Sequence, residues 1–121
     1  MTRLLKSFIA LITAVGMVFG LSACASDTID MKKVTSVIDV RTSAEYAAGH
    51  LEGAINIDVE ASDFNDQVMK LDTNGTYVVY CHSGRRAGIA MDQMKSMGFK
   101  NVTNAGGITD AASVTGLAIV Q

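Results

Sequence analysis

The chain has 121 residues, 49% of them hydrophobic, and a formal net charge of −2 at pH 7. This length accommodates one small globular domain, and the weak negative charge argues against a general affinity for nucleic acid or for anionic membrane surfaces. With only two cysteines, a disulfide framework is excluded as well.

The first 23 residues have the pattern of an export signal. Arg3 and Lys6 precede an uncharged apolar segment, and small residues follow it. Residues 21–24, Leu-Ser-Ala-Cys, resemble a bacterial lipobox. We therefore predict a signal peptide over 1–23 and a lipid on the sulfur of Cys24, which would anchor the protein on the periplasmic or other extracytoplasmic face of a bacterial membrane.

Two other fates of this segment stay open. Cleavage after Ala25 fits the small residues on either side of Cys24 and would release a soluble periplasmic protein. An uncleaved anchor is disfavoured, because the apolar segment is short for the ~20 residues of a bilayer span. Removal of the signal leaves 8 basic residues against 12 acidic ones, a net charge of −4. We assign residues 24–33 to a tether and 34–121 to one domain.

In this domain strand-like and helix-like segments alternate. The apolar run 34–40 predicts a buried parallel strand. Thr42 is then placed to cap a helix, with Glu45 as its capping-box partner and Gly49 ending it in the left-handed conformation. Residues 54–57 predict a second, short strand.

A helix and a third strand come next. Apolar residues at helical spacing predict the helix, which ends at the turn formed by residues 72–75. These apolar residues are Phe64, Val68 and Leu71. The third strand, 76–80, leads directly to Cys81, and a short polar turn follows it.

A second helix begins after this turn and is closed by Gly98. One apolar face of it is formed by Ala87, Ala90, Met91, Met94 and Met97. We interpret the methionines as core packing rather than as a copper site. Strands at 101–104 and 117–120 complete a three-layer α/β/α domain with a mainly parallel sheet, in which sites lie at the carboxyl ends of the strands.

Cys81 has the surroundings of a nucleophile. A strand that passes directly into a helix leaves unpaired N–H groups and the positive end of the helix dipole in the turn, and both favour a thiolate. Arg85 and Arg86 add positive charge. If Cys24 carries lipid, Cys81 has no intramolecular disulfide partner. The alternative is a buried structural thiol, which is seldom followed by Ser-Gly-Arg-Arg.

Three blocks of the chain resemble the rhodanese family of sulfurtransferases. The active-site loop of that family has a cysteine, two variable residues, a glycine, one variable residue and an arginine, which match Cys81, Gly84 and Arg86. Residues 38–57 and 97–108 resemble its N-terminal and C-terminal signatures. The resemblance runs from about residue 34 to the end and implies a five-stranded parallel sheet with helices on both faces.

The resemblance implies transfer of sulfane sulfur from thiosulfate or a similar small anion to a thiol or cyanide through a persulfide on Cys81. Backbone N–H groups from His82 through Ser83 and Gly84 to Arg86 would form an anion nest, and the two arginines would attract the donor. We expect a monomer, no cofactor and no metal, because the histidines, the free cysteine and the carboxylates lack ligand spacing.

Several side chains have a second interpretation. Arg85 is either a donor-binding residue or a solvated residue at the start of the helix. Arg86 either shapes the loop and contacts an oxyanion, or pairs with a nearby carboxylate. His82 is interpreted as a loop residue that tunes pH dependence, since a thiolate in a nest needs no base. Asp39 and Arg41, at the end of the first strand, are expected to brace the site.

The chain departs from the family pattern at two places. Glu52 stands where a proline is common, and Ala111 and Ala112 occupy a region that often holds a tryptophan, which predicts a looser final turn. Two rival functions stay open: a phosphatase or arsenate reductase, and a non-catalytic rhodanese-like binding module. The first normally needs a loop one residue longer and a histidine in place of Tyr80, and retention of Cys81 argues against the second.

Overall fold

A computed structural model describes residues 28–121 of the chain. The signal peptide over 1–23 and the lipid on Cys24 are predictions that lie outside these described residues. Within residues 28–121 no helix is long and apolar enough to cross a bilayer.

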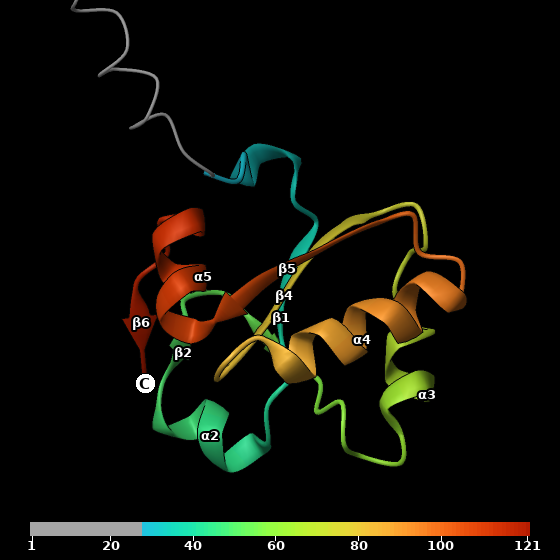
Figure 1. Cartoon of the computed structure of the whole chain (residues 1–121), viewed down its shortest axis with the longest axis horizontal. Coiled ribbons are helices and arrows are strands. Elements are labelled where there is room, and N and C mark those ends of the chain that lie inside the picture. The colour runs from blue at the N-terminus through green and yellow to red at the C-terminus, as the bar shows by residue number, and fades with distance from the viewer. Residues whose placement is uncertain (1–27) are drawn as a thin grey trace, which may run out of the picture.

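The described chain alternates strands and helices (Figure 1). The helical elements are η1 (Met31–Lys33), α2 (Ser43–Ala48), α3 (Phe64–Val68), α4 (Arg85–Ser96) and α5 (Ile108–Thr115). The strands are β1 (Ser36–Asp39), β2 (His50–Leu51), β3 (Ile55–Asn56), β4 (Thr76–Cys81), β5 (Asn101–Gly107) and β6 (Ile119–Val120). This order is that of an α/β domain.

Four parallel strands form the central sheet in the order β3-β1-β4-β5. The prediction of a fifth strand in this sheet is wrong. The segment predicted at 117–120 contains β6, which pairs antiparallel with β2 in a separate two-stranded ribbon. Both strands of this ribbon have only two residues, so neither carries a pattern from which their pairing can be read.

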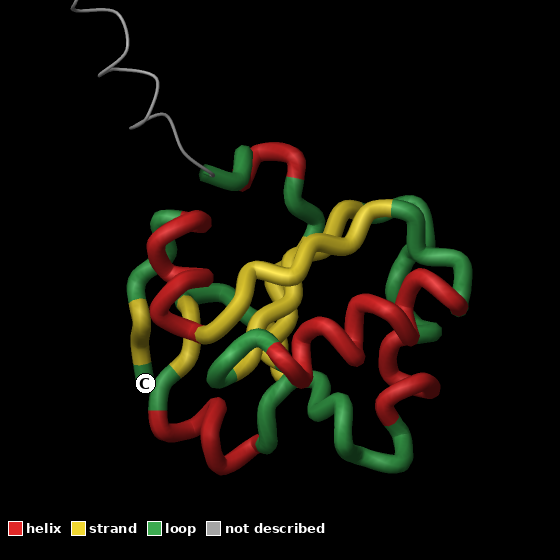
Figure 2. The backbone as a smooth tube through the Cα atoms, in the orientation of Figure 1, coloured by secondary structure: helices red, strands yellow, loops and turns green. Residues whose placement is uncertain are grey.

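Helices cover both faces of the sheet, so the domain has three layers (Figure 2). Successive residues of a strand point to opposite faces. In β4, Val79 packs in the core beneath α3 and α4, whereas its neighbour Val78 packs on the other side with residues of α5 and β2. The predicted apolar face of α4 is confirmed, because Ala87 and Met94 are fully buried in the first of these cores. The helix predicted to end at residues 72–75 is shorter than expected, since α3 ends at Val68 and Leu71 packs against the core from the segment after it.

The local predictions succeed unevenly. The capping box is confirmed, since Thr42 Oγ1 accepts from the Glu45 N–H and the Glu45 carboxylate accepts from the Thr42 N–H. Gly49 ends α2 as predicted but with φ 157° and ψ 134°, which is not the left-handed helical conformation. The segment for which a looser final turn is predicted forms α5, and Ala111 is fully buried on it.

Candidate active site

Cys81 is the last residue of β4, the strand that lies between β1 and β5 in the sheet. Its side chain is fully buried, and α4 begins four residues later at Arg85. The intervening loop lies at the carboxyl ends of the parallel strands, on the side where β4 passes into α4 (Figure 1). In open α/β sheets this edge is the usual position of a binding site.

The loop turns back on the sulfur. The N–H of Gly84 donates a hydrogen bond to Cys81 Sγ, with 2.9 Å between nitrogen and sulfur. Gly84 has φ 95°, a left-handed conformation that a residue with a side chain adopts only with strain. A backbone donor aimed at sulfur stabilises the anionic form of that sulfur more than the neutral form. The glycine therefore makes possible the turn that brings this donor to the thiol.

Glycines of β5 let the loop approach the sheet closely. Gly107 is the partner of Cys81 across the β4–β5 pair, and a Cβ on Gly107 would overlap the carbonyl oxygen of His82. A Cβ on Gly84 would lie 3.3 Å from the Cα of Gly106. These contacts explain why the glycine pair 106–107 belongs to the site, although it lies more than twenty residues after the cysteine.

Arg86 forms an ion pair with Glu45. Its two terminal nitrogens donate to the two carboxylate oxygens at 2.7 and 2.9 Å. Hydrogen bonds from this guanidinium lower the pKa of Glu45 to about 2, and the same carboxylate raises the pKa of Arg86 above its usual value. Of the two interpretations of Arg86, the structure shows the ion pair, which ties the first turn of α4 to α2.

Asp39 and Arg41 form a second, buried ion pair beside the loop. Arg41 Nη2 lies 2.7 Å from Asp39 Oδ2 and also donates to the carbonyl of Gly49 at 2.6 Å. The hydrogen bond to Asp39 raises the pKa of Arg41. Asn56 donates to the carbonyl oxygens of Asp39 and Arg41, so the ends of β1, α2 and β3 are held together.

Tyr80 fixes the end of β4 from the other face of the sheet. Its hydroxyl accepts a hydrogen bond from the N–H of Leu51 at 2.9 Å, and the ring is fully buried. Burial raises the pKa of this phenol well above its usual value. The residue immediately before the cysteine is therefore a neutral structural anchor to β2, a role that no local pattern in the sequence indicates.

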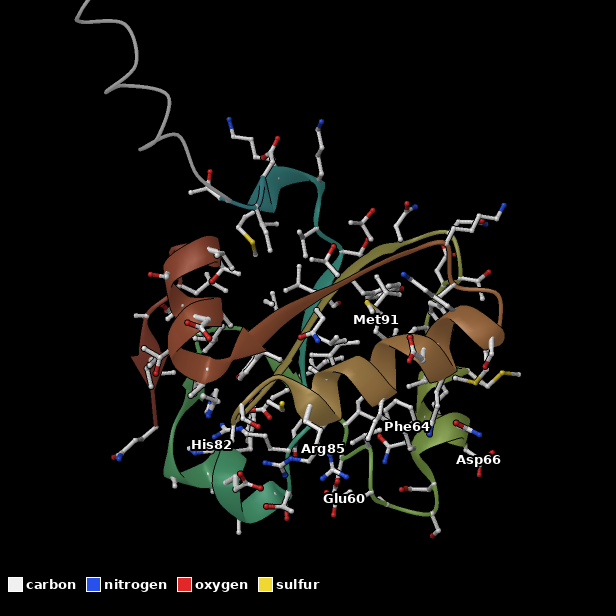
Figure 3. All side chains as sticks on the ribbon, in the orientation of Figure 1. Glu60, Phe64, Asp66, His82, Arg85 and Met91 are labelled. Carbon is white, nitrogen blue, oxygen red and sulfur yellow. The ribbon has the colours of Figure 1, made fainter. Side chains whose placement is uncertain are left out.

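The remaining loop residues are exposed. His82, Ser83 and Arg85 have solvent-accessible side chains. Figure 3 shows His82 and Arg85 at the end of the molecule where α4 begins, with Glu60 on the same side. Within residues 28–121 no three His, Cys, Asp or Glu side chains are grouped as metal ligands. The site thus combines a buried sulfur held by a backbone donor with a polar, accessible rim.

Comparison with known proteins agrees with this geometry. A family model described as a rhodanese-like domain matches residues 23–112. The thiosulfate sulfurtransferase PspE of Escherichia coli is 40% identical over 75 residues, which cover 62% of this chain and 72% of PspE. The putative sulfur carrier protein YrkF of Bacillus subtilis is 33% identical over 76 residues, which cover 63% of this chain and 40% of YrkF.

Solved structures show the same fold. A rhodanese with anions from E. coli has a TM-score of 0.59 at 35% identity, and the match covers 71% of this chain and 96% of that one. The rhodanese-like domain of the Alr3790 protein from Anabaena has a TM-score of 0.63 at 25% identity, covering 73% and 82%. The family match extends over most of the chain and includes the cysteine loop. The protein therefore belongs to the rhodanese-like domain family.

Proposed function

We propose that this protein is a thiosulfate:acceptor sulfurtransferase that carries sulfur as a persulfide on Cys81. One observation carries the proposal: a buried cysteine sulfur at the end of β4 accepts the N–H of Gly84 at 2.9 Å. A sulfur held in this way is stabilised as the thiolate, the form that attacks. The similarity to PspE, a thiosulfate sulfurtransferase, supports thiosulfate as the donor.

The reaction has two balanced steps. The Cys81 thiolate attacks the outer sulfur of thiosulfate, a new S–S bond forms, and the bond to the sulfonate sulfur breaks with its electron pair leaving on sulfite. Cyanide or an acceptor thiolate then attacks the outer sulfur of the persulfide. The electron pair of the broken S–S bond returns to Cys81, and thiocyanate or an acceptor persulfide leaves.

Some of the described residues bind the sulfur or attract the donor anion, and others support the loop. The Gly84 N–H holds negative charge on Sγ and on the persulfide that replaces it. Arg85, exposed at the rim, provides the positive charge that brings a dianion to a domain of negative net charge. Arg86 and Glu45 hold the loop in place, so Arg86 acts through the loop geometry.

The rival phosphatase or arsenate reductase function is weaker. Such chemistry needs an arginine that grips a tetrahedral oxyanion, whereas both terminal nitrogens of Arg86 bond Glu45. The loop from Cys81 to Arg86 is also the shorter form of the two. A non-catalytic binding module would not need the Gly84 donor on the sulfur.

Mass spectrometry of the purified full chain tests the proposal. After thiosulfate treatment, Cys81 should gain about 32 Da, one sulfur atom, and cyanide should remove it. The Cys81→Ser variant should fold, carry no added sulfur and form no thiocyanate. Cys24→Ser is the matched control, which should load and turn over like the wild type. Loading that persists in Cys81→Ser and is lost in Cys24→Ser would refute the assignment.

We further propose that Cys24 is the lipidation site of an exported form, on the strength of the lipobox-like run 21–24. In cells fed a labelled fatty acid, wild type and Cys81→Ala should incorporate the label and sediment with membranes. Cys24→Ala should do neither. Labelling that survives in Cys24→Ala would contradict the proposal, and a soluble unlabelled wild type would favour cleavage after Ala25.

A further inference from the structure

Asn104, on β5, reaches the cysteine loop through its side-chain amide. Its Nδ2 donates to the carbonyl oxygen of Gly84 at 3.1 Å, and its Oδ1 accepts from the N–H of Gly106 at 2.8 Å. One partner needs a donor and the other needs an acceptor, so the orientation of the amide is fixed. Asn104 therefore joins the loop that holds the sulfur to the glycine pair on which that loop packs.

The contact with Gly84 falls at a critical point. The carbonyl of Gly84 also accepts the first helical hydrogen bond of α4, from the N–H of Gly88 at 3.0 Å. Gly84 is the N-cap of this helix and has no side chain that could cap it. Its φ of 95° must be held by contacts with neighbouring residues, because glycine has little conformational preference of its own.

The same glycine provides the donor to the sulfur. The Gly84 N–H points at Cys81 Sγ at 2.9 Å, while its carbonyl bonds Asn104. A rotation of this residue that lengthened one contact would also alter the other, since both groups belong to a single residue. The amide on β5 is thus mechanically linked to the hydrogen bond on the thiolate.

We propose that Asn104 is a positioning residue for Cys81, which fixes Gly84 so that its N–H stays on the sulfur. This rests on the proposed function only in taking Cys81 as the reacting group. The hydrogen bond to the sulfur comes from Gly84, and Asn104 acts on the sulfur through Gly84. Neither aspartate nor leucine can replace it, because aspartate offers no donor to a carbonyl and leucine offers no polar atom.

The test measures alkylation of Cys81 by iodoacetamide in the full chain, as a function of pH, with the adduct assigned to Cys81 by peptide mass spectrometry. The variants are Asn104→Asp and Asn104→Leu, both close to asparagine in size. Asn101→Leu is the matched control, an exposed asparagine at the other end of the same strand. Thermal unfolding of each variant shows that it is folded at the assay temperature.

Both Asn104 variants should alkylate roughly 2- to 5-fold more slowly at neutral pH, with the rate profile moved to higher pH. This is the lower range for a lost hydrogen bond, as expected because Asn104 is exposed. Asn101→Leu should match the wild type. Rates within roughly 1.5-fold of the wild type in both variants would overturn the proposal, because the loss of even a weak hydrogen bond should change the rate by more than this.

A loss in Asn104→Asp alone would also overturn it, because added charge would then suffice. If Asn104→Leu does not fold, the proposal is tested by the alkylation rate of Asn104→Asp in about 0.5 M salt, which screens an exposed charge. A loss that persists in salt supports positioning, and one that disappears refutes it. Iodoacetamide needs no sulfur donor, so absent sulfur transfer with a clear Asn104 effect would count against the proposed function only.

Discussion

The ion pair between Glu45 and Arg86 makes the stability of this domain depend on pH in a defined way. Replacement of Glu45 by glutamine keeps the size of the side chain and its capping acceptor but removes the charge. It weakens the two hydrogen bonds from Arg86, which measure 2.7 and 2.9 Å. We therefore expect Glu45→Gln to destabilise the contact between α2 and the start of α4.

The size of the effect follows from the pKa of Glu45, which falls from 4.5 to about 2 in the folded protein. At 1.36 kcal/mol for each pH unit, this corresponds to an upper bound of about 3 kcal/mol. The two side chains are 33% and 20% exposed, and solvent screens a pair at such a position. We expect about 1–2 kcal/mol in the free energy of unfolding, above an ordinary surface pair because the contact is bidentate.

The sign of the pH dependence is set by the lowered pKa. The stabilisation is fully present above about pH 4.5, where Glu45 is charged in both folded and unfolded chains, and is lost as the pH falls toward 2. Urea unfolding at several pH values should therefore show a constant deficit for Glu45→Gln between pH 5 and 8, within roughly the error of the extrapolation. The deficit should shrink between about pH 4.5 and 2.

Glu52→Gln is the control, since Glu52 is an exposed carboxylate outside this pair. It should leave the free energy of unfolding within about 0.5 kcal/mol of the wild type. A Glu45→Gln deficit that is absent at pH 7, or that is equally large at pH 2.5, would show that the ion pair does not stabilise the fold as described.

Two further predictions concern residues around the sulfur. Arg86→Ala should lower kcat/KM for thiosulfate roughly 5- to 30-fold because the loop loses its ion pair with α2, whereas Arg85→Ala should lower it about twofold, and only at low salt. Steady-state kinetics at two ionic strengths separate the two variants, and a larger loss in Arg85→Ala would contradict these roles. Gly107→Ala should cost about 1–3 kcal/mol of unfolding free energy through overlap with the loop backbone. Gly88→Ala, on helix α4 with its added Cβ 3.5 Å from the nearest atom, should leave the free energy of unfolding unchanged or raise it, and urea unfolding of both glycine variants measures the difference.

The features that the sequence predicted are those set by neighbouring residues. The capping box of Thr42 and Glu45 spans four positions, and the apolar run before Cys81 ends in the turn that forms the loop. Helix α4 could be located from the spacing of its buried residues. Propensity, capping and periodicity all act over a few residues, so one chain is enough to show them.

The missed features join distant parts of the chain. The local sequence predicts a capping role for Glu45, but its carboxylate also binds Arg86, 41 residues away. The pairing of β2 with β6 and the bond from Asn104 to Gly84 are likewise nonlocal. Such contacts depend on how the elements pack. When a side chain has two partners, only the partner that lies nearby in the sequence can be predicted from the local pattern.

The chain enters the domain at the end of the sheet opposite to the cysteine loop. Strands β1 and β4 are parallel, and the Thr35 N–H bonds the Thr76 carbonyl where both begin, beside η1, whereas Cys81 ends β4 (Figure 1). The six residues of β4 place these two ends about 17 Å apart. If the N-terminal segment anchors the domain to a membrane, Cys81 lies at the end of the domain that is farther from the membrane. The sulfur acceptor would then approach from the surrounding solution rather than from the lipid.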